Sequence, residues 1–327
     1  MRDLILEDTC EKSDADKNDK DDPSTCDFHT KNLPKTIVDL RQLLSNKISE
    51  NEMFYSFEIV STKKPKTFYQ RLLLDMEKYS PLFYALTWHN EEASNDDSYL
   101  PLDLVESFPS NTLLHLAAKD LKRDEVARIL KKAFALGIIN IFALRGDSSS
   151  GNGDFEHAAD LVAFIREQFG NKFCICVAGY PQTHPESPSK YLDLYYLKAK
   201  VDAGADFIIT QICFESRILI DFVKDCREIG IQVPIIPGIL APTSYFCLEK
   251  MTNTCGLDVP VTIKNDLAGM KDDKAVRKYS SDLVARIIAD VTESGATRGF
   301  HLFTLNRLSV VAEICKRVEQ LRNVESS

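Results

Sequence analysis

The sequence predicts an α/β fold of the (β/α)8 barrel type, in which eight parallel strands alternate with helices. Three observations favour this class. Short apolar runs typical of buried strands alternate with amphipathic helical patterns. Eight such units fill about 290 residues, and no strand-rich segment is left over. Polar side chains also recur where the expected strands end. An open doubly wound sheet is the alternative, because a sequence does not show whether its sheet closes.

The composition narrows the class of protein. A chain of 327 residues with 44% hydrophobic content can bury a large core, and a net charge of −9 argues against a nucleic-acid binder. The nine cysteines are scattered, and Cys174-x-Cys176 is too close for a zinc knuckle. We therefore expect reduced structural thiols, no metal and a cytoplasmic location. No apolar run approaches the roughly 20 residues that span a bilayer, so we expect no membrane segment.

Residues 1–34 differ from the rest of the chain. They are acidic and poor in apolar residues, so they cannot bury enough surface to order themselves. They are also too acidic for a transit peptide and contain no apolar core for a signal peptide. We predict a disordered acidic tail over residues 1–34 and a single catalytic barrel over residues 35–327.

The apolar patterns assign each element in order. Helical spacing begins at residue 33 (Ile37, Leu40, Leu44) and ends before Phe54. The expected strands, rich in β-branched and aromatic residues, are 54–60, 82–86, 113–116, 138–144, 173–178, 207–211, 234–238 and 299–305. The expected helices that follow the first are 66–79, 124–136, 156–168, 189–203, 217–228, 244–253, 274–293 and 310–321. The helix over 274–293 is an addition to the simple alternation.

The fourth strand, 138–144, is nearly all apolar and breaks off into Arg145-Gly146-Asp147. An unbroken apolar run fits a strand covered on both faces, as in a parallel sheet. A charged pair flanking a glycine suits a ligand site at the carboxyl edge of that sheet. Glu58 lies in the middle of the first strand, where it either faces solvent at a sheet edge or serves a function.

Other polar residues fall at or just past strand ends. They are Thr87, His115, Arg145 with Asp147, Tyr180 with His184, Gln211, and Asn306 with Arg307. Individually, Thr87 could cap a turn, His115 could be a hydrogen-bonded core histidine, and Gln211 could be an edge residue. Together they predict a ligand site on one rim, because active sites of this fold lie on the face where the strands end.

The rim lacks several familiar motifs. There is no G-x-G-x-x-G, no P-loop, no cluster with metal-ligand spacing and no central strand lysine for a Schiff base. A nucleotide could still be held by Arg145, His184, Lys200 and backbone amides at helix starts. The chemistry left is that of an organic cofactor, with the protein supplying an acid and positioning groups.

A chain of short segments, in unbroken order over residues 36–323, resembles the catalytic barrel of methylenetetrahydrofolate reductase. The segments are Phe57-Glu58, Thr87-Trp88, Ala143-Leu144-Arg145-Gly146-Asp147, Val177-Ala178-Gly179-Tyr180-Pro181, His184-Pro185-Glu186, Ala203-Gly204-Ala205-Asp206-Phe207-Ile208-Ile209-Thr210-Gln211, Pro237-Gly238-Ile239 and Phe303-Thr304-Leu305-Asn306-Arg307. The C-terminal regulatory domain of many eukaryotic members has no counterpart in this sequence, which predicts no inhibition by S-adenosylmethionine.

The resemblance implies a flavoenzyme that is reduced by NAD(P)H and then, in ping-pong order, reduces methylenetetrahydrofolate. The implied FAD contacts are Thr87, Trp88, His115, Arg145, Gly146, Asp147, His157, Ala158, Tyr180, His184, Asp193 and Lys200. Glu58 matches the general acid, which would protonate the folate's bridging nitrogen and open its ring. Asp147 would sit beside flavin and pterin. Gln211 would hold the pterin amide, Arg307 would meet the glutamate carboxylates, and Phe303 would also contact the folate.

Three segments depart from the family pattern. Ile59-Val60-Ser61-Thr62 replaces a Phe-Pro-Pro-like segment beside the acid. Residues 241–246 replace the loop where family members stack nicotinamide or pterin, and Leu116-Ala117-Ala118 replaces a Thr-Cys pair. The alternatives to an active reductase are a divergent flavin- or folate-binding relative without turnover, and another FAD barrel enzyme resembling proline dehydrogenase. The choice between NADH and NADPH and the oligomeric state, homo-oligomer or not, stay open at this level.

Overall fold

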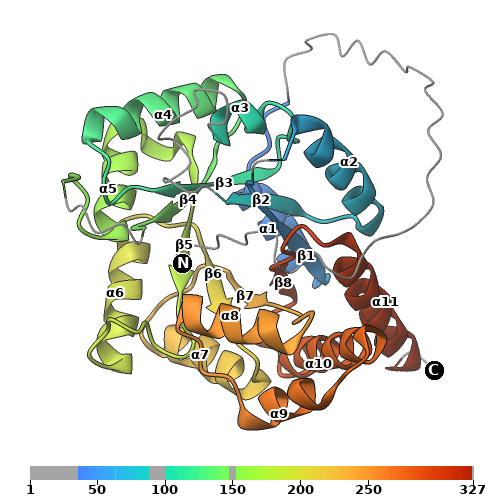
Figure 1. Ribbon diagram of the computed structural model, residues 1–327. Helices are drawn as coiled ribbons and strands as arrows, with labels where there is room; N and C mark the ends of the chain where they lie inside the picture. Colours follow the sequence, from blue (N-terminus) through green and yellow to red (C-terminus); the bar gives the residue numbers. More distant parts are fainter. Residues whose placement is uncertain (1–35, 63, 88–100, 147–151, 326–327) are drawn as a thin grey trace, which may run out of the picture.

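In the computed structural model, which describes residues 36–62, 64–87, 101–146 and 152–325, eight parallel strands form a closed barrel (Figure 1). The strands are β1 (Phe54–Val60), β2 (Phe83–Thr87), β3 (Thr112–Ala117), β4 (Asn140–Leu144), β5 (Cys174–Gly179), β6 (Phe207–Ile212), β7 (Ile235–Ile239) and β8 (Gly299–Leu302). Each strand pairs with the next in sequence, and β8 pairs back onto β1. The predicted (β/α)8 barrel is confirmed, and the open sheet is excluded.

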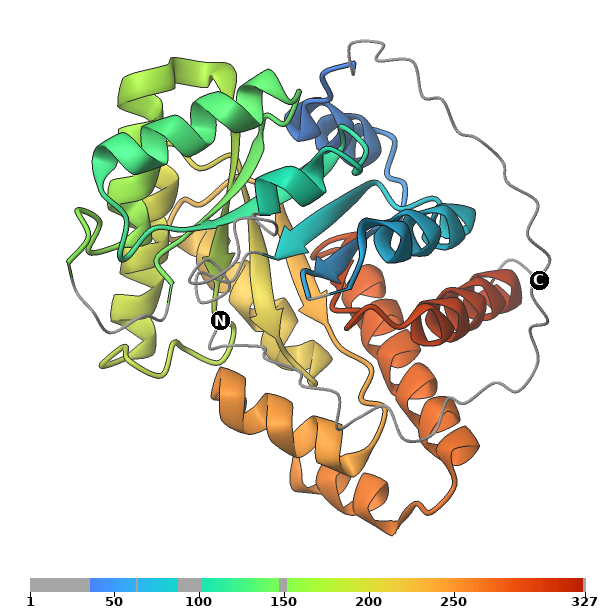
Figure 2. The ribbon, with the colours of Figure 1, turned by 45° about the horizontal axis from the view of Figure 1, so that its top comes forward.

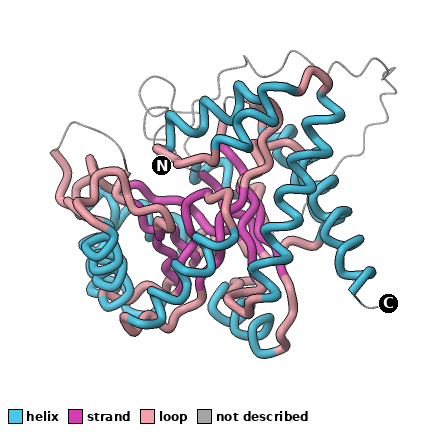
Figure 3. Tube along the Cα trace, turned by 90° about the horizontal axis from the view of Figure 1, so that it is seen from below, coloured by secondary structure: helices cyan, strands magenta, loops and turns pink. Residues whose placement is uncertain are grey.

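Helices enclose this barrel on all sides, as the view from below makes plain (Figure 3). They are α1 (Leu40–Ser49), α2 (Lys66–Met76), α3 (Pro101–Val105), α4 (Arg123–Ala135), α5 (Ala158–Phe169), α6 (Lys190–Asp202), α7 (Ser216–Glu228), α8 (Tyr245–Cys255), α9 (Val261–Gly269), α10 (Asp273–Glu293) and α11 (Leu308–Glu325). The additional helix expected over 274–293 is α10, which packs along α11 and α7 (Figure 2).

Side chains alternate along each strand between the barrel interior and the surrounding helices. On β2, Phe83 and Ala85 belong to the interior cluster, whereas Tyr84 and Leu86 pack in the cluster beneath the helices. This two-residue period decides which polar side chains enter the barrel. Cys174 also lies in the interior, and its burial raises the pKa of its thiol well above the ordinary value, which suits an unreactive structural thiol.

Helix α1 closes the N-terminal end of the barrel. Its Leu40 and Leu44 join the interior cluster. The side chain of Asn140 clamps the start of the helix, because its Oδ1 accepts from the Leu40 amide at 3.0 Å and its Nδ2 donates to the Val38 carbonyl at 2.9 Å. Two backbone groups beside the helix start are thereby satisfied inside the protein.

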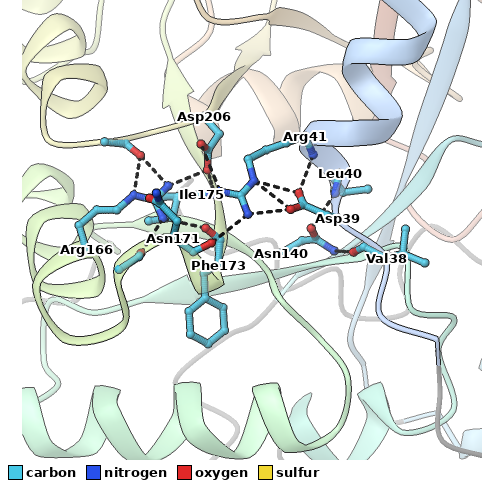
Figure 4. Close-up of polar contacts among 12 residues, drawn as sticks. Val38, Asp39, Leu40, Arg41, Asn140, Arg166, Asn171, Phe173, Ile175 and Asp206 are labelled. Carbon is cyan, nitrogen blue, oxygen red and sulfur yellow. Dashed lines mark hydrogen bonds and ion pairs between the residues drawn. The ribbon is translucent and has the colours of Figure 1, made fainter.

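An ion-pair network anchors the same end (Figure 4). The guanidinium of Arg41 donates to the carboxylate of Asp39. Nη1 of Arg41 also lies 4.0 Å from Oδ1 of Asp206. Oδ2 of Asp206 in turn accepts from Arg166 Nη2 and from the Ile175 amide, each at 2.7 Å. The network ties α1 to α5 and to the segment that enters β6, at the end of the barrel away from the predicted site.

Several element boundaries differ from the sequence-based expectation. The first helix begins at Leu40 rather than at residue 33, because the preceding Asp39 caps it by accepting from the Arg41 amide. Helices α3 and α9 were not predicted; α9 is short and buries only Ile263 and Leu267. The predicted disordered tail, 1–34, lies outside the described residues.

The eighth strand also ends early, at Leu302 rather than at residue 305. Leu305 and Asn306 adopt left-handed conformations, with φ of 51° and 58°. The chain therefore turns where the apolar run Phe303-Thr304-Leu305 suggested continued strand. The Arg307 amide closes this turn by donating to the Thr304 carbonyl at 2.9 Å, and side chains of Thr304 and Asn306 add bonds to β1, which a strand pattern does not reveal.

Candidate functional site

Glu58 lies inside the barrel with no exposed surface. It shares the inward-facing register of Phe54 and Ser56 on β1. Burial raises the pKa of its carboxyl to about 7, because ionisation in an apolar surrounding is costly. The sequence left open whether Glu58 faces solvent at a sheet edge or serves a function, and the structure excludes the position facing solvent.

Thr87, at the end of β2, is bonded to this carboxyl. Its Oγ1 donates to Glu58 Oε1 at 2.9 Å, which partly offsets the rise of the pKa. Oε2 of Glu58 is buried and has no hydrogen-bond partner among the described residues. One carboxylate oxygen is therefore held, and the other is left for a ligand.

His115 on β3 lies beside Thr87, one strand further around the barrel. Leu86 pairs with Leu114, so one step further along the register sets His115 beside Thr87. The imidazole is buried and meets the Phe142 ring edge-on, with ring centroids 4.8 Å apart. The structure thus brings Glu58, Thr87 and His115 to neighbouring inward positions on three adjacent strands.

Arg145 and Gly146 follow β4 at the same carboxyl edge. The Arg145 guanidinium forms an ion pair with Glu186 at 2.6 Å, and its side chain is 27% exposed. Gly146 has φ of +90° and lies against Ala117, so a Cβ there would be both strained and crowded. Asp147, and Trp88 after β2, were predicted as site residues and lie outside the described residues.

Four predicted site residues gather between the end of β5 and α6. The rings of Tyr180 and His184 meet edge-on at 4.5 Å, and Lys200 Nζ lies 6.0 Å from the Tyr180 ring centroid while donating to the Ala178 carbonyl. Burial lowers the pKa of Lys200 to about 8, and it raises the pKa of Asp193. Burial likewise lowers the pKa of His184. The cluster thus combines the amine of Lys200, the carboxyl of Asp193 and two rings, a polar set that suits a ligand with both donors and acceptors.

His157 and Ala158 lie at the N-terminus of α5. His157 is the exposed N-cap residue, and its amide donates to Asp160 Oδ2 at 2.8 Å. Ala158 opens the helix. The amide of Asp160 in this first turn donates back to the His157 carbonyl at 3.1 Å, and the flavin contact implied for His157 and Ala158 stays a prediction.

The remaining predicted residues lie on β6 and after β8. Gln211 is buried at 8% exposure, with its Oε1 accepting from the Ile212 amide at 2.9 Å. Phe303 is 2% exposed and meets the ring of His301 edge-on at 4.9 Å. Burial lowers the pKa of His301 to about 3, so this interior imidazole is neutral. Arg307 is half-buried just beyond.

Residues 304 and 306 make contacts that sequence reasoning did not assign. Thr304 Oγ1 donates to the Glu58 carbonyl at 2.5 Å, and the Asn306 side chain bonds both backbone groups of Val60. Glu186, the partner of Arg145, was likewise quoted only as part of a motif. Asn306 was singled out as a polar residue at a strand end and Thr304 and Glu186 only as members of motifs, but their contacts could not be predicted because their partners are distant in sequence.

No group of three or more His, Cys, Asp or Glu that could hold a metal ion occurs in the described part of the chain. Over the same residues, the helices are too short or too polar to cross a membrane. The fold and site define a (β/α)8 barrel with a buried acid and a polar carboxyl edge.

Comparison with known proteins agrees with this class. The family model "Methylenetetrahydrofolate reductase" matches residues 43–319. A probable methylenetetrahydrofolate reductase (NADPH) of Caenorhabditis elegans is 35% identical over 301 residues, which are 86% of this chain and 45% of that one. Methylenetetrahydrofolate reductase (NADH) 1 of Arabidopsis thaliana is 35% identical over 70% of this chain and 41% of its own. The chain therefore belongs to the methylenetetrahydrofolate reductase family, as its motifs predicted.

Two further facts qualify the comparison. The chain spans about half the length of the curated relatives that it matches. Among solved structures, a protein of Clostridium thermocellum that binds two copies of 5-methyl-5,6,7,8-tetrahydrofolic acid has a TM-score of 0.59 at 15% identity, covering 86% of this chain and 99% of that one. That likeness concerns the fold.

Proposed function

We propose that the barrel reduces 5,10-methylenetetrahydrofolate to 5-methyltetrahydrofolate, with FAD as cofactor and NAD(P)H as reductant. Family membership supports the reaction class. The observation that carries the proposal is the carboxyl of Glu58, which is buried, has a pKa raised to about 7 and presents one oxygen without a partner among the described residues.

Glu58 acts as a general acid. Near neutral pH a substantial fraction of this carboxyl is protonated, which an ordinary glutamate is not. Because Thr87 donates to Oε1, the proton resides on Oε2, the oxygen that points to no described protein acceptor. Transfer of that proton to the bridging nitrogen of the folate breaks the C–N bond of the five-membered ring and leaves a carbon ready to accept hydride.

The donor set at the carboxyl edge fits FAD. Arg145 and Lys200 supply positive charge, Tyr180 supplies an aromatic surface, and the start of α5 supplies backbone amides for phosphate oxygens. A bound FAD would supply the redox chemistry, accepting hydride from NAD(P)H and donating hydride to the folate. The guanidinium of Arg145 is held by its ion pair with Glu186.

The folate is held by residues of β6 and of the segment after β8. Gln211 presents an amide suited to the pterin ring, with its Oε1 already engaged by the Ile212 amide. Arg307, following β8, meets the glutamate carboxylates. Phe303, packed edge-on against His301, would add an apolar contact.

The test is Glu58→Gln, which keeps the shape of the side chain but removes the transferable proton. The purified variant should retain a flavin spectrum and be bleached by NAD(P)H at the wild-type rate, while folate reduction falls by at least 100-fold. Glu167→Gln, on the exposed face of α5, is the matched control and should leave both half-reactions unchanged. Equal loss of both half-reactions in Glu58→Gln would refute the role of the acid.

A second candidate is a protein that binds flavin or folate without turnover. The loop after β7 favours it, because residues 241–246 depart from the family pattern and place Tyr245 and Phe246 on the surface, 39% and 56% exposed. Folate turnover by the wild-type protein, followed anaerobically, excludes this candidate. Tight binding of flavin without turnover supports it.

A further inference from the structure

We propose that Thr304 and Asn306 are positioning residues, which hold the carboxyl end of β1 so that Glu58 stays enclosed and oriented toward the substrate. We call their side-chain contacts with β1 the β1 latch. The inference rests on the proposed function, because it concerns the acid of that reaction, but it assigns a role to residues that touch neither cofactor nor substrate.

The latch begins where the backbone ladder between β8 and β1 gives way. The register runs from Phe54 opposite Gly299 to Phe57 opposite Leu302. Beyond this point side chains take over. Thr304 Oγ1 donates to the carbonyl of Glu58 at 2.5 Å. Asn306 Oδ1 accepts from the Val60 amide at 2.9 Å, and its Nδ2 donates to the Val60 carbonyl at 2.7 Å.

The turn that carries the latch is strained. Leu305 and Asn306 both have positive φ, a conformation that costs energy for a residue such as leucine. Two hydrogen bonds close this turn. The Arg307 amide donates to the Thr304 carbonyl at 2.9 Å, and Thr304 Oγ1 accepts from the Asn306 amide at 3.1 Å, which joins the two latch residues to each other. These bonds, together with those to β1, maintain the strained turn, which brings both side chains to one strand.

On its other edge β1 is held by β2. Glu58 lies opposite Ala85 and Val60 opposite Thr87. The acid is therefore fixed by β2 on one side and by the latch on the other. Without the latch this end of β1 has one partner strand, so it separates more readily and admits water to the carboxyl.

Entry of water has a defined consequence. Burial is the main cause of the raised pKa of Glu58, so hydration returns that pKa toward 4.5. The titratable groups nearby on packed elements are His301 on β8, His115 on β3 and Arg307 after the latch. Burial keeps His301 neutral. The hydrogen bond from Thr87 lowers the pKa of Glu58 and so opposes the effect of burial. Loosening the latch thus lowers the pKa of the acid.

The experiment compares Thr304→Val, which removes the hydroxyl at nearly constant shape, with Asn306→Gly, which removes both bonds to Val60 while still accepting positive φ. Both should retain flavin and its reduction by NAD(P)H. The pH profile of folate reduction should move down by about one unit, which lowers the rate above neutral pH about tenfold. Thr304→Ser, which keeps the hydroxyl, should restore the wild-type profile.

Asn140→Ala is the matched control. Asn140 also clamps two backbone groups, but at the other end of the barrel. It should lower stability without moving the pH profile. If Thr304→Val does not fold, Asn306→Gly, which relieves strain, decides alone, and faster amide hydrogen exchange at Val60 gives a second readout. Flavin-loaded variants with an unshifted profile would overturn the positioning role, whereas a wild type unable to reduce folate would overturn the proposed function.

Discussion

Thr87 on β2 donates a 2.9 Å hydrogen bond to one oxygen of Glu58 on β1, and the other oxygen of that carboxyl is buried without a partner among the described residues. Two opposing influences therefore act on a single acid: burial raises its pKa, and the bond from Thr87 lowers it. The balance, at about 7, places the acid where proton transfer near neutral pH is effective.

Removal of the Thr87 hydroxyl should raise the pKa of Glu58 further. In Thr87→Val the carboxylate loses the donor that stabilises its charged form, whereas its burial is unchanged. We expect the alkaline limb of the folate pH profile to move up by about one unit, the direction opposite to loosening of the β1 latch. Stopped-flow measurement of the folate half-reaction from pH 6 to 9 checks this. A profile that moves down would contradict it.

Glu58→Gln should change how stability depends on pH. The folded-state pKa of Glu58, about 7, lies above its ordinary value of 4.5, so its contribution is full below pH 4.5 and is lost as pH rises through about 7. Glutamine does not titrate. The free energy of unfolding of wild type relative to the variant should therefore fall by about 3 kcal/mol over this range. Urea titrations at several pH values measure the difference, and a constant difference would argue that the carboxyl is hydrated.

Asp206→Asn should destabilise the closed N-terminal end of the barrel. The carboxylate of Asp206 bonds Arg166 and the Ile175 amide and lies near Arg41, with its side chain 20% exposed. Loss of its charge leaves two half-buried arginines with less compensation, and we expect a loss of about 2 kcal/mol in the free energy of unfolding. Asp221→Asn removes an exposed pair with Arg217 and should cost less than about 0.5 kcal/mol. Similar urea midpoints for the two variants would contradict this account.

Gly238→Ala should disturb the join between β6 and β7. A Cβ at this position would lie 2.2 Å from the Thr210 carbonyl oxygen and 2.6 Å from the ring of Phe303. Backbone and a buried ring must both move, at a cost of about 1–3 kcal/mol. Gly269, with no atom within 4 Å of its added Cβ, is the control, and its alanine variant should be neutral or slightly stabilising. Thermal unfolding of the two variants is the measurement.

Much of the fold could be predicted from local pattern. The alternation of apolar strands and amphipathic helices located all eight strands, and the interruption of the fourth by Arg145-Gly146 placed its carboxyl end correctly. The position of Glu58 within an otherwise apolar strand identified it as a candidate acid. These predictions succeed because burial repeats apolar residues every 2 positions along a strand and every 3.6 along a helix, and this repeat can be seen within a short stretch of sequence.

Other features depended on residues brought together by folding. Closure of the sheet, the ion pair of Arg145 with Glu186, and the bond from Thr304 to the Glu58 carbonyl across 246 positions of sequence have no local signature. The early end of β8 was missed as well, since the strand-like pattern continues through Leu305 while the backbone already turns, held by the bond from the Arg307 amide to the Thr304 carbonyl and by side-chain bonds to β1. The sequence by itself determined the order of the eight strands, most of the helices between them and the candidate acid, while α3, α9 and the end of β8 were not predicted. The tertiary structure alone decided that the acid is enclosed and bonded at one oxygen, because that depends on β1 meeting β2 and β8 when the ring of strands closes.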